Sequence, residues 1–151
     1  MSQGKPWERK KARSFVLQAL YQWQVGQQSI TDIEHQFLCE QKMGRTDINY
    51  FRELIKEIPT QVSRIDEEFS AFISRELNEI SPIELATLRI ATYEFLQHQE
   101  IPYRVIINEA VELAKKFGAT ESHKFINSVV DRVAHKVRAT EIAGEKSKSN
   151  G

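Results

Sequence analysis

The chain has 151 residues, of which 40% are hydrophobic and 28% charged, a composition that excludes a disordered chain. No apolar run approaches the roughly 20 residues of a membrane helix, which excludes a membrane-spanning chain. A single cysteine, Cys39, excludes a disulfide framework and a cysteine-based zinc site, and it favours a reducing, cytoplasmic setting. The 21 basic and 21 acidic residues cancel overall but not locally, because residues 1–13 and 115–138 each sum to +4 whereas residues 46–114 sum to −7.

Helical spacing of apolar residues begins near the amino terminus and predicts four helices in the first half of the chain. The first covers residues 8–25 and ends at a glycine. The second begins at Ser29, a good capping residue. The third covers residues 47–57 and is ended by Pro59, and the fourth covers residues 61–75.

Three more helices are predicted in the second half. Ser81 and the proline that follows it are a strong start signal for a helix over residues 82–97. A proline also begins the sixth helix, over residues 102–117, although the residue before it is a poor cap. The seventh begins near residues 120–122 and runs to about residue 138.

These elements predict an all-α fold of about seven helices with no β-sheet, in one domain over residues 5–138. Because the connections are short, the helices are expected to pack as antiparallel neighbours in one or two bundles. The polar, aperiodic tail over residues 139–151 is predicted to be disordered.

The sequence lacks the usual patterns of catalytic and metal sites. The six glycines are too scattered for a phosphate-binding loop. The histidines do not pair at the i, i+4 spacing of a helical metal site; they are His35, His98, His123 and His135. We therefore expect no catalytic residue, metal or cofactor.

The acidic residues and the cysteine also have ordinary structural interpretations. Glu112 is expected to pair with Lys116 on a solvated helix face. Cys39 is expected to be a small core residue. A hydrolase that uses Glu109 or His123 is the enzymatic alternative.

The first helix begins with a cluster of bases. Arg9, Lys10 and Arg13 fall within one turn of one another, Lys11 points elsewhere, and no acid follows Glu8 on this helix. Uncompensated bases at helical spacing repel one another, which favours a polyanion as their partner. Nucleic acid is the first interpretation, and a solvated surface or an anionic lipid surface are the alternatives.

A second basic element lies at the start of the seventh helix. Exposed amides at a helix start attract an anion, Lys124 adds charge, and Phe125 offers a flat face to an unpaired base. The alternative is that Phe125 packs in the core beside Ile126 and Val129.

Four blocks of the sequence, in order and at matching spacing, resemble the NusB family of transcription antitermination factors. They are ARSFVLQALYQW (12–23), LRIATYE (88–94), PYRVIINEAVELAKKFG (102–118) and SHKFINSVVD (122–131). The resemblance implies two helical bundles and no catalysis. It also implies binding of the boxA element of ribosomal RNA leader transcripts, together with the ribosomal protein NusE, within the elongating RNA polymerase complex.

The resemblance also implies site residues. RNA-binding positions carried over from the family are Arg9, Lys10, Lys11, Arg13, Glu121, Lys124 and Phe125. Glu84 matches a position where the family meets NusE, and its place in the acidic middle suits a basic partner. A purely protein-binding helical adaptor is the alternative function, and the sequence leaves open whether the chain is a monomer or a homodimer.

Overall fold

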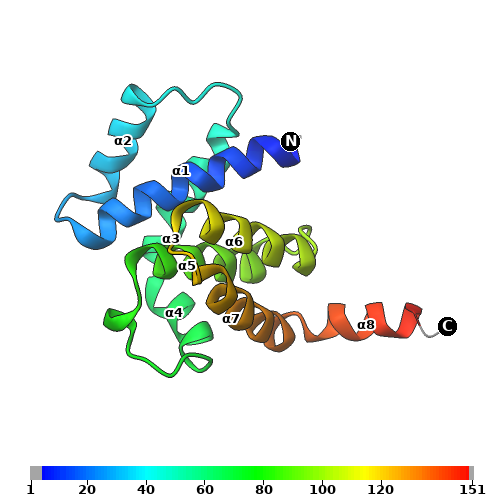
Figure 1. Ribbon diagram of the computed structural model, residues 1–151. Coiled ribbons are helices and arrows are strands. Elements are labelled where there is room, and N and C mark those ends of the chain that lie inside the picture. The colour runs from blue at the N-terminus through cyan, green and yellow to red at the C-terminus, as the bar shows by residue number, and fades with distance from the viewer. Residues whose placement is uncertain (1–4, 150–151) are drawn as a thin grey trace.

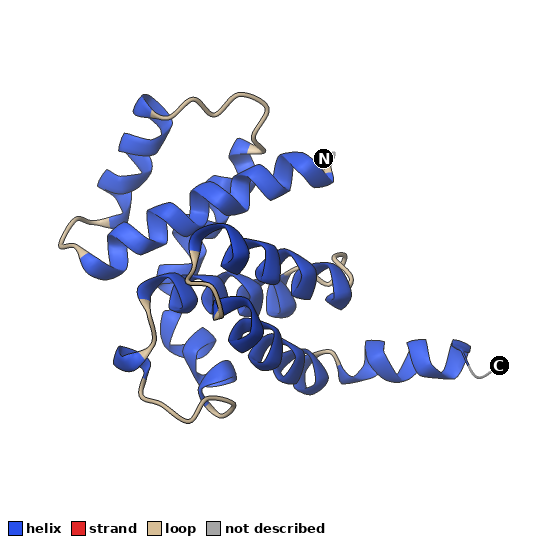
Figure 2. Ribbon diagram, in the orientation of Figure 1, coloured by secondary structure: helices blue, strands red, loops and turns tan. Residues whose placement is uncertain are grey.

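The computed structural model describes residues 5–149 as a helical protein (Figures 1 and 2). Within that range there are eight α-helices and one short 3₁₀ turn: α1 (Pro6–Val25), α2 (Ile30–Glu40), α3 (Ile48–Thr60), α4 (Val62–Ser70), η1 (Leu77–Glu79), α5 (Pro82–Gln97), α6 (Tyr103–Phe117), α7 (Ser122–Val137) and α8 (Ala139–Ser149). The all-α prediction is confirmed. None of the helices in this part of the chain is long and apolar enough to cross a membrane.

Helix α5 is the centre of the fold. Every residue from Ala86 to Phe95 is buried, so that α5 is covered on all sides. It packs against five other helices: α1, α3, α4, α6 and α7. The helices thus form two groups, α1–α3 and α4–α7, which share α5 and one continuous apolar core.

Several helix starts follow from local hydrogen bonds. The Ser29 hydroxyl accepts from the Asp32 amide at 3.1 Å, and the Ser81 hydroxyl accepts from the Glu84 amide at 3.1 Å, as the capping pattern predicts. These two starts are confirmed. Helix α1 begins earlier than expected, at Pro6, because the carboxylate of Glu8 accepts from the backbone amide just before the helix, at 3.1 Å.

Two predicted boundaries are wrong. Helix α3 continues through Pro59 to Thr60, since a proline in the last turn removes only one amide donor. Helix α4 ends at Ser70 instead of residue 75, where the chain tightens into i→i−3 hydrogen bonds from the Phe72 and Ile73 amides, at 3.0 and 3.3 Å.

The tail that was expected to be disordered forms helix α8 as far as Ser149; residues 150–151 lie outside the described range. Ile142 is 5% exposed and anchors α8 to the core. The carboxylate of Glu141 accepts from the Tyr103 amide at 3.0 Å, and so supplies the cap that the start of α6 lacks in its own sequence. The polar composition of the tail gave no indication of this helix, because the residues that stabilise it lie on α6.

Arg138, which follows α7, fastens the carboxyl end of α5. Its guanidinium donates to the carbonyl oxygens of Phe95 (2.9 Å), Ile101 (3.0 Å) and His98 (2.9 Å). It also contacts the carboxylate of Glu141 at 2.5 Å. One base of the second basic segment is therefore buried as a helix cap and is not part of the charged surface.

Candidate nucleic-acid interface

Arg13 lies inside the protein. Its side chain is 4% exposed, and its guanidinium holds the carboxylate of Glu94 on α5 with three contacts of 2.9–3.1 Å. The hydroxyl of Tyr50 on α3 donates to the same carboxylate. Burial lowers the pKa of Arg13, but the adjacent Glu94 outweighs it and the net shift is upward, so Arg13 stays protonated. Arg13, which was predicted to bind RNA, is thus buried in this structure and joins α1, α3 and α5.

Arg9 is largely covered by the same region of the fold. Its side chain is 14% exposed and lies between Asp47 and Glu100, at 3.8 and 3.7 Å. The guanidinium carbon also sits 4.2 Å from the centre of the Tyr50 ring. Arg9 is thus partly neutralised by the protein itself and offers RNA only a small part of its surface.

Glu94 is the buried residue that the sequence interpretation missed. It was counted only as one of the acids of the acidic middle, yet it is 1% exposed. Glu94 is the one carboxylate in the run 85–96, which is otherwise mostly apolar, and this was a detectable signal because such a group is buried only when a base pairs with it.

Lys10 and Lys11, by contrast, face solvent along a groove between α1 and α6, which lie side by side (Figure 1). The groove holds about 250 Å³ and is lined by Lys10, Lys11, Ser14, Glu109, Glu112, Leu113 and Lys116. The Nζ of Lys10 is 3.5 Å from the carboxylate of Glu109, and its side chain is still half exposed.

Lys116 brings the second basic segment into this groove. Its Nζ contacts the Ser14 hydroxyl on α1 at 3.5 Å, and the expected partner Glu112 pairs with Lys115 at 3.8 Å instead. The predicted Glu112–Lys116 pair is therefore wrong. The consequence is that the two basic segments, a hundred residues apart in sequence, meet on one surface.

The start of α7 holds the other predicted RNA-binding residues. Lys124 pairs with Glu121 at 2.8 Å, with both side chains exposed. Phe125 is half-buried: it packs against the core, and the guanidinium of Arg75 covers its ring at 4.8 Å. The expected core packing of Phe125 is therefore seen in part, and its intermediate exposure leaves part of the ring at the surface; stacking on a base stays a prediction.

Glu84 lies in the first turn of α5, beside the far end of α1. There the Gln24 side chain donates to the carbonyl of Pro82 at 2.8 Å. Lys11 and Gln24 are separated by about 20 Å along α1, at 1.5 Å per residue. Opposite ends of one helix therefore carry the basic groove and the acidic position.

The residues of the enzymatic alternative do not form a catalytic arrangement. Glu109 contacts Lys10 and the guanidinium of Arg13, at 3.5 and 4.0 Å. His123 lies on the following helix, at the start of α7. No group of three or more metal-ligating side chains occurs among residues 5–149. Cys39 is exposed, with Sγ 3.7 Å from the Nε2 of His35, so the prediction of a core cysteine is wrong.

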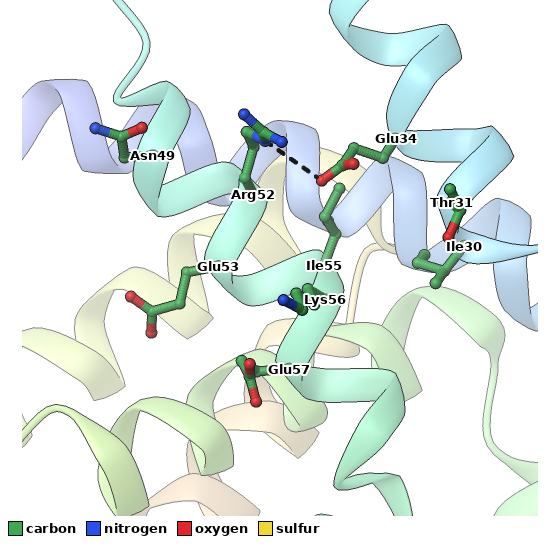
Figure 3. A pocket seen from close by; sticks show the side chains of 9 residues that line it. All are labelled: Ile30, Thr31, Glu34, Asn49, Arg52, Glu53, Ile55, Lys56 and Glu57. Carbon is green, nitrogen blue, oxygen red and sulfur yellow. Dashed lines mark ion pairs between the residues drawn. The ribbon is translucent and has the colours of Figure 1, made fainter.

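A cavity larger than this groove lies elsewhere, between α2 and α3 (Figure 3). It holds about 580 Å³, and acids and bases alternate around it. Arg52 and Glu34 form an ion pair across it at 3.6 Å. Its carboxylates (Glu34, Glu53 and Glu57) outnumber its bases (Arg52 and Lys56), so its net charge is negative and does not attract a polyanion.

Comparison with known proteins identifies the family. The model of the NusB family matches residues 10–135. The chain belongs to the NusB family. NusB members are non-catalytic transcription antitermination factors, so the predicted function class is confirmed and the enzymatic alternative is set aside.

Relatives and solved structures agree with this membership. The transcription antitermination protein NusB of Shewanella sediminis is 50% identical over 129 residues, covering 85% of this chain and 96% of that protein. The NusB of Pectobacterium carotovorum is 48% identical over 134 residues, covering 89% and 96%. The structure of T. maritima NusB superposes with a TM-score of 0.71 at 31% identity, covering 87% of this chain and 92% of that one. A structure of the antitermination factors NusB and NusE in complex with dsRNA has the same fold, with a TM-score of 0.75 at 24% identity and coverage of 85% and 97%.

Proposed function

We propose that this member of the NusB family binds single-stranded boxA RNA along the groove between α1 and α6. The observation that carries the proposal is the convergence of Lys10 and Lys11 on α1 with Lys116 on α6. Three lysines on one surface neutralise consecutive phosphates and release counterions. Lysine provides charge without the planar fork of arginine, so this groove contributes affinity more than base selection.

The start of α7 is the second part of the proposed interface. Lys124 exchanges Glu121 for an RNA phosphate at small cost, because exposed ion pairs contribute little. The accessible portion of Phe125 stacks on a base after Arg75 moves from its ring toward the backbone of the RNA. Arg9 adds its small exposed surface, and Arg13 acts by holding α1 in place.

NusE is the proposed protein partner, at the other end of α1. Glu84 offers a carboxylate near the end of α1, whose last two turns also carry the exposed side chain of Tyr21, and an acidic position together with an exposed aromatic ring suits a basic ribosomal protein. Because RNA and NusE occupy different ends of one rigid helix, they bind together without competing. Each then raises the effective concentration of the other.

In the proposed mechanism the protein acts as a stoichiometric adaptor in the cytoplasm. It holds boxA of the nascent ribosomal RNA leader next to NusE, and the assembly joins elongating RNA polymerase. The alternative, a protein-binding adaptor without RNA recognition, leaves the convergent lysines without a role.

The test is a titration of boxA RNA and a scrambled RNA of the same length, each with and without NusE. The expected result is tighter binding of boxA than of the scrambled RNA, with a further gain when NusE is present. Equal binding of both RNAs, with or without NusE, contradicts the proposal. Sedimentation of the purified protein separates monomer from homodimer in the same buffer.

A further inference from the structure

The amino-terminal end of α1 has an exposed aromatic side chain surrounded by bases. Trp7 is 39% exposed. The Nζ of Lys11 lies 5.7 Å from the centre of a Trp7 ring, and the guanidinium carbon of Arg45 lies 5.6 Å from it. Arg45 comes from the loop between α2 and α3, so the cluster forms only in the folded protein.

The fold holds the Arg45 loop against α1. The Asp47 amide donates to the carbonyl of Glu8 at 3.1 Å, which ties the end of the loop to the first turn of α1. Thr46 and Met43 are buried beneath it, and the Thr46 amide donates to the Met43 carbonyl at 2.9 Å. Trp7 and Arg45 are therefore presented by a fixed backbone.

The bases of this cluster are not neutralised within the described part of the chain. Lys11, Arg45 and the neighbouring Lys42 are exposed, and no carboxylate of residues 5–149 lies within 4.0 Å of their charged nitrogens. Among the acids close in sequence, Glu8 accepts from the amide before α1 and Asp47 pairs with Arg9 at 3.8 Å. The result is an aromatic face within a local excess of positive charge.

We infer that Trp7, with Arg45 and Lys11, is a stacking platform for an unpaired base of the bound RNA, beyond the groove that holds boxA. The indole accepts the flat face of a base, and the two cations move from the ring to the adjacent phosphates. Lys11 also lines the α1–α6 groove, so the platform is continuous with the proposed interface. This inference rests on the proposed function, because it requires RNA to be bound in that groove.

A fluorescence titration tests the inference directly. The Trp23→Phe variant retains Trp7 as its single tryptophan. Single-stranded boxA RNA with a short extension at each end is expected to quench Trp7 emission, and boxA RNA without the extensions is expected to quench it less. Unchanged emission during a titration that saturates by gel shift overturns the inference.

Substitutions give an independent measurement. Trp7→Ala and Trp7→Leu are expected to weaken binding of the extended RNA about five- to tenfold, which is the lower end of the affinity loss that follows removal of one stacked base. Trp7→Phe is expected to retain most of the affinity, because its ring can still stack. Arg45→Ala is expected to weaken it about two- to threefold. Arg64→Ala is the matched control, an exposed arginine on α4, and is expected to change nothing.

The failures of the two proposals are distinguishable. The stacking platform is overturned if Trp7→Leu and Arg45→Ala bind RNA with wild-type affinity. The proposed groove still stands in that case if a Lys10→Ala/Lys11→Ala variant binds more weakly. Absence of boxA binding by the wild-type protein with NusE overturns the proposed function. Equal losses in Trp7→Leu and Trp7→Phe, together with a lower melting temperature, show that Trp7 only anchors the loop, which also overturns the inference.

Discussion

The salt dependence of RNA binding separates the exposed lysines of α1 from its buried arginines. Four exposed lysines, Lys10, Lys11, Lys116 and Lys124, line the proposed interface. If each neutralises one phosphate of a single strand, log K falls against log salt with a slope of about −2.8. Raising salt from about 50 to 200 mM then weakens binding about fiftyfold.

The double variant Lys10→Ala/Lys11→Ala removes two of these contacts. Its slope is expected to be about −1.4, so the same change in salt weakens binding only about sevenfold. The helical content and melting temperature are expected to stay unchanged, because both side chains are exposed. The matched control is Lys56→Ala/Arg64→Ala, which removes the same charge from exposed positions on α3 and α4.

Arg13→Ala is expected to behave in the opposite way. It leaves Glu94 buried without its partner, which costs about 3–5 kcal/mol of unfolding free energy and lowers the melting temperature on the order of 10 °C. Its salt slope, measured on folded protein at low temperature, stays at the wild-type value. A flattened slope in Arg13→Ala, or an unchanged slope in the double-lysine variant, refutes the assignment of these residues.

The remaining predictions concern single sites. Arg138→Ala leaves the terminal carbonyls of α5 without donors and is expected to lower the unfolding free energy by about 3 kcal/mol in chemical denaturation, with Arg138→Lys restoring only part of it. Phe125→Ala is expected to lose about 1 kcal/mol of RNA binding, and affinity equal to wild type per folded molecule would assign the ring to the core alone. Glu84→Lys is expected to weaken NusE binding by calorimetry while RNA affinity in the absence of NusE is unchanged; equal NusE affinity removes that assignment. Burial raises the pKa of Glu100, but hydrogen bonding by His98 and the charge of Arg9 outweigh burial, and the net pKa lies below its ordinary value. The ionised Glu100 therefore stabilises the fold at neutral pH, and this contribution is lost as the pH falls through the lowered pKa. Glu100→Gln should therefore reduce the acid dependence of the melting temperature.

Local chemistry was sufficient for most of the helices. Ser29 and Ser81 cap where their side chains can reach an amide three residues on, and that reach is a property of a few neighbouring residues. The same reasoning failed for α8, since Glu141 caps the start of α6 and Ile142 packs on a core that the tail does not contain. A helix stabilised from outside its own sequence leaves little local signal.

In the candidate site, too, the direction of a side chain could be predicted from local spacing, but its partner could not. Arg13 precedes Val16 and Leu17 by three and four residues, so its inward direction on α1 could have been predicted from helical spacing. Glu94 could not have been assigned as its partner from that spacing, because the two residues are 81 positions apart.

Periodicity, capping and charge count thus established a helical chain with basic ends and an acidic middle, since these properties depend on neighbours along the backbone. Which bases are available to a ligand was decided by packing. α5 places a carboxylate against Arg13, the end of α5 engages Arg138, and α6 carries Lys116 to Ser14. A buried charge must have a partner within the protein, whereas an exposed charge need not. A basic residue is therefore structural at one position and available to a ligand at another.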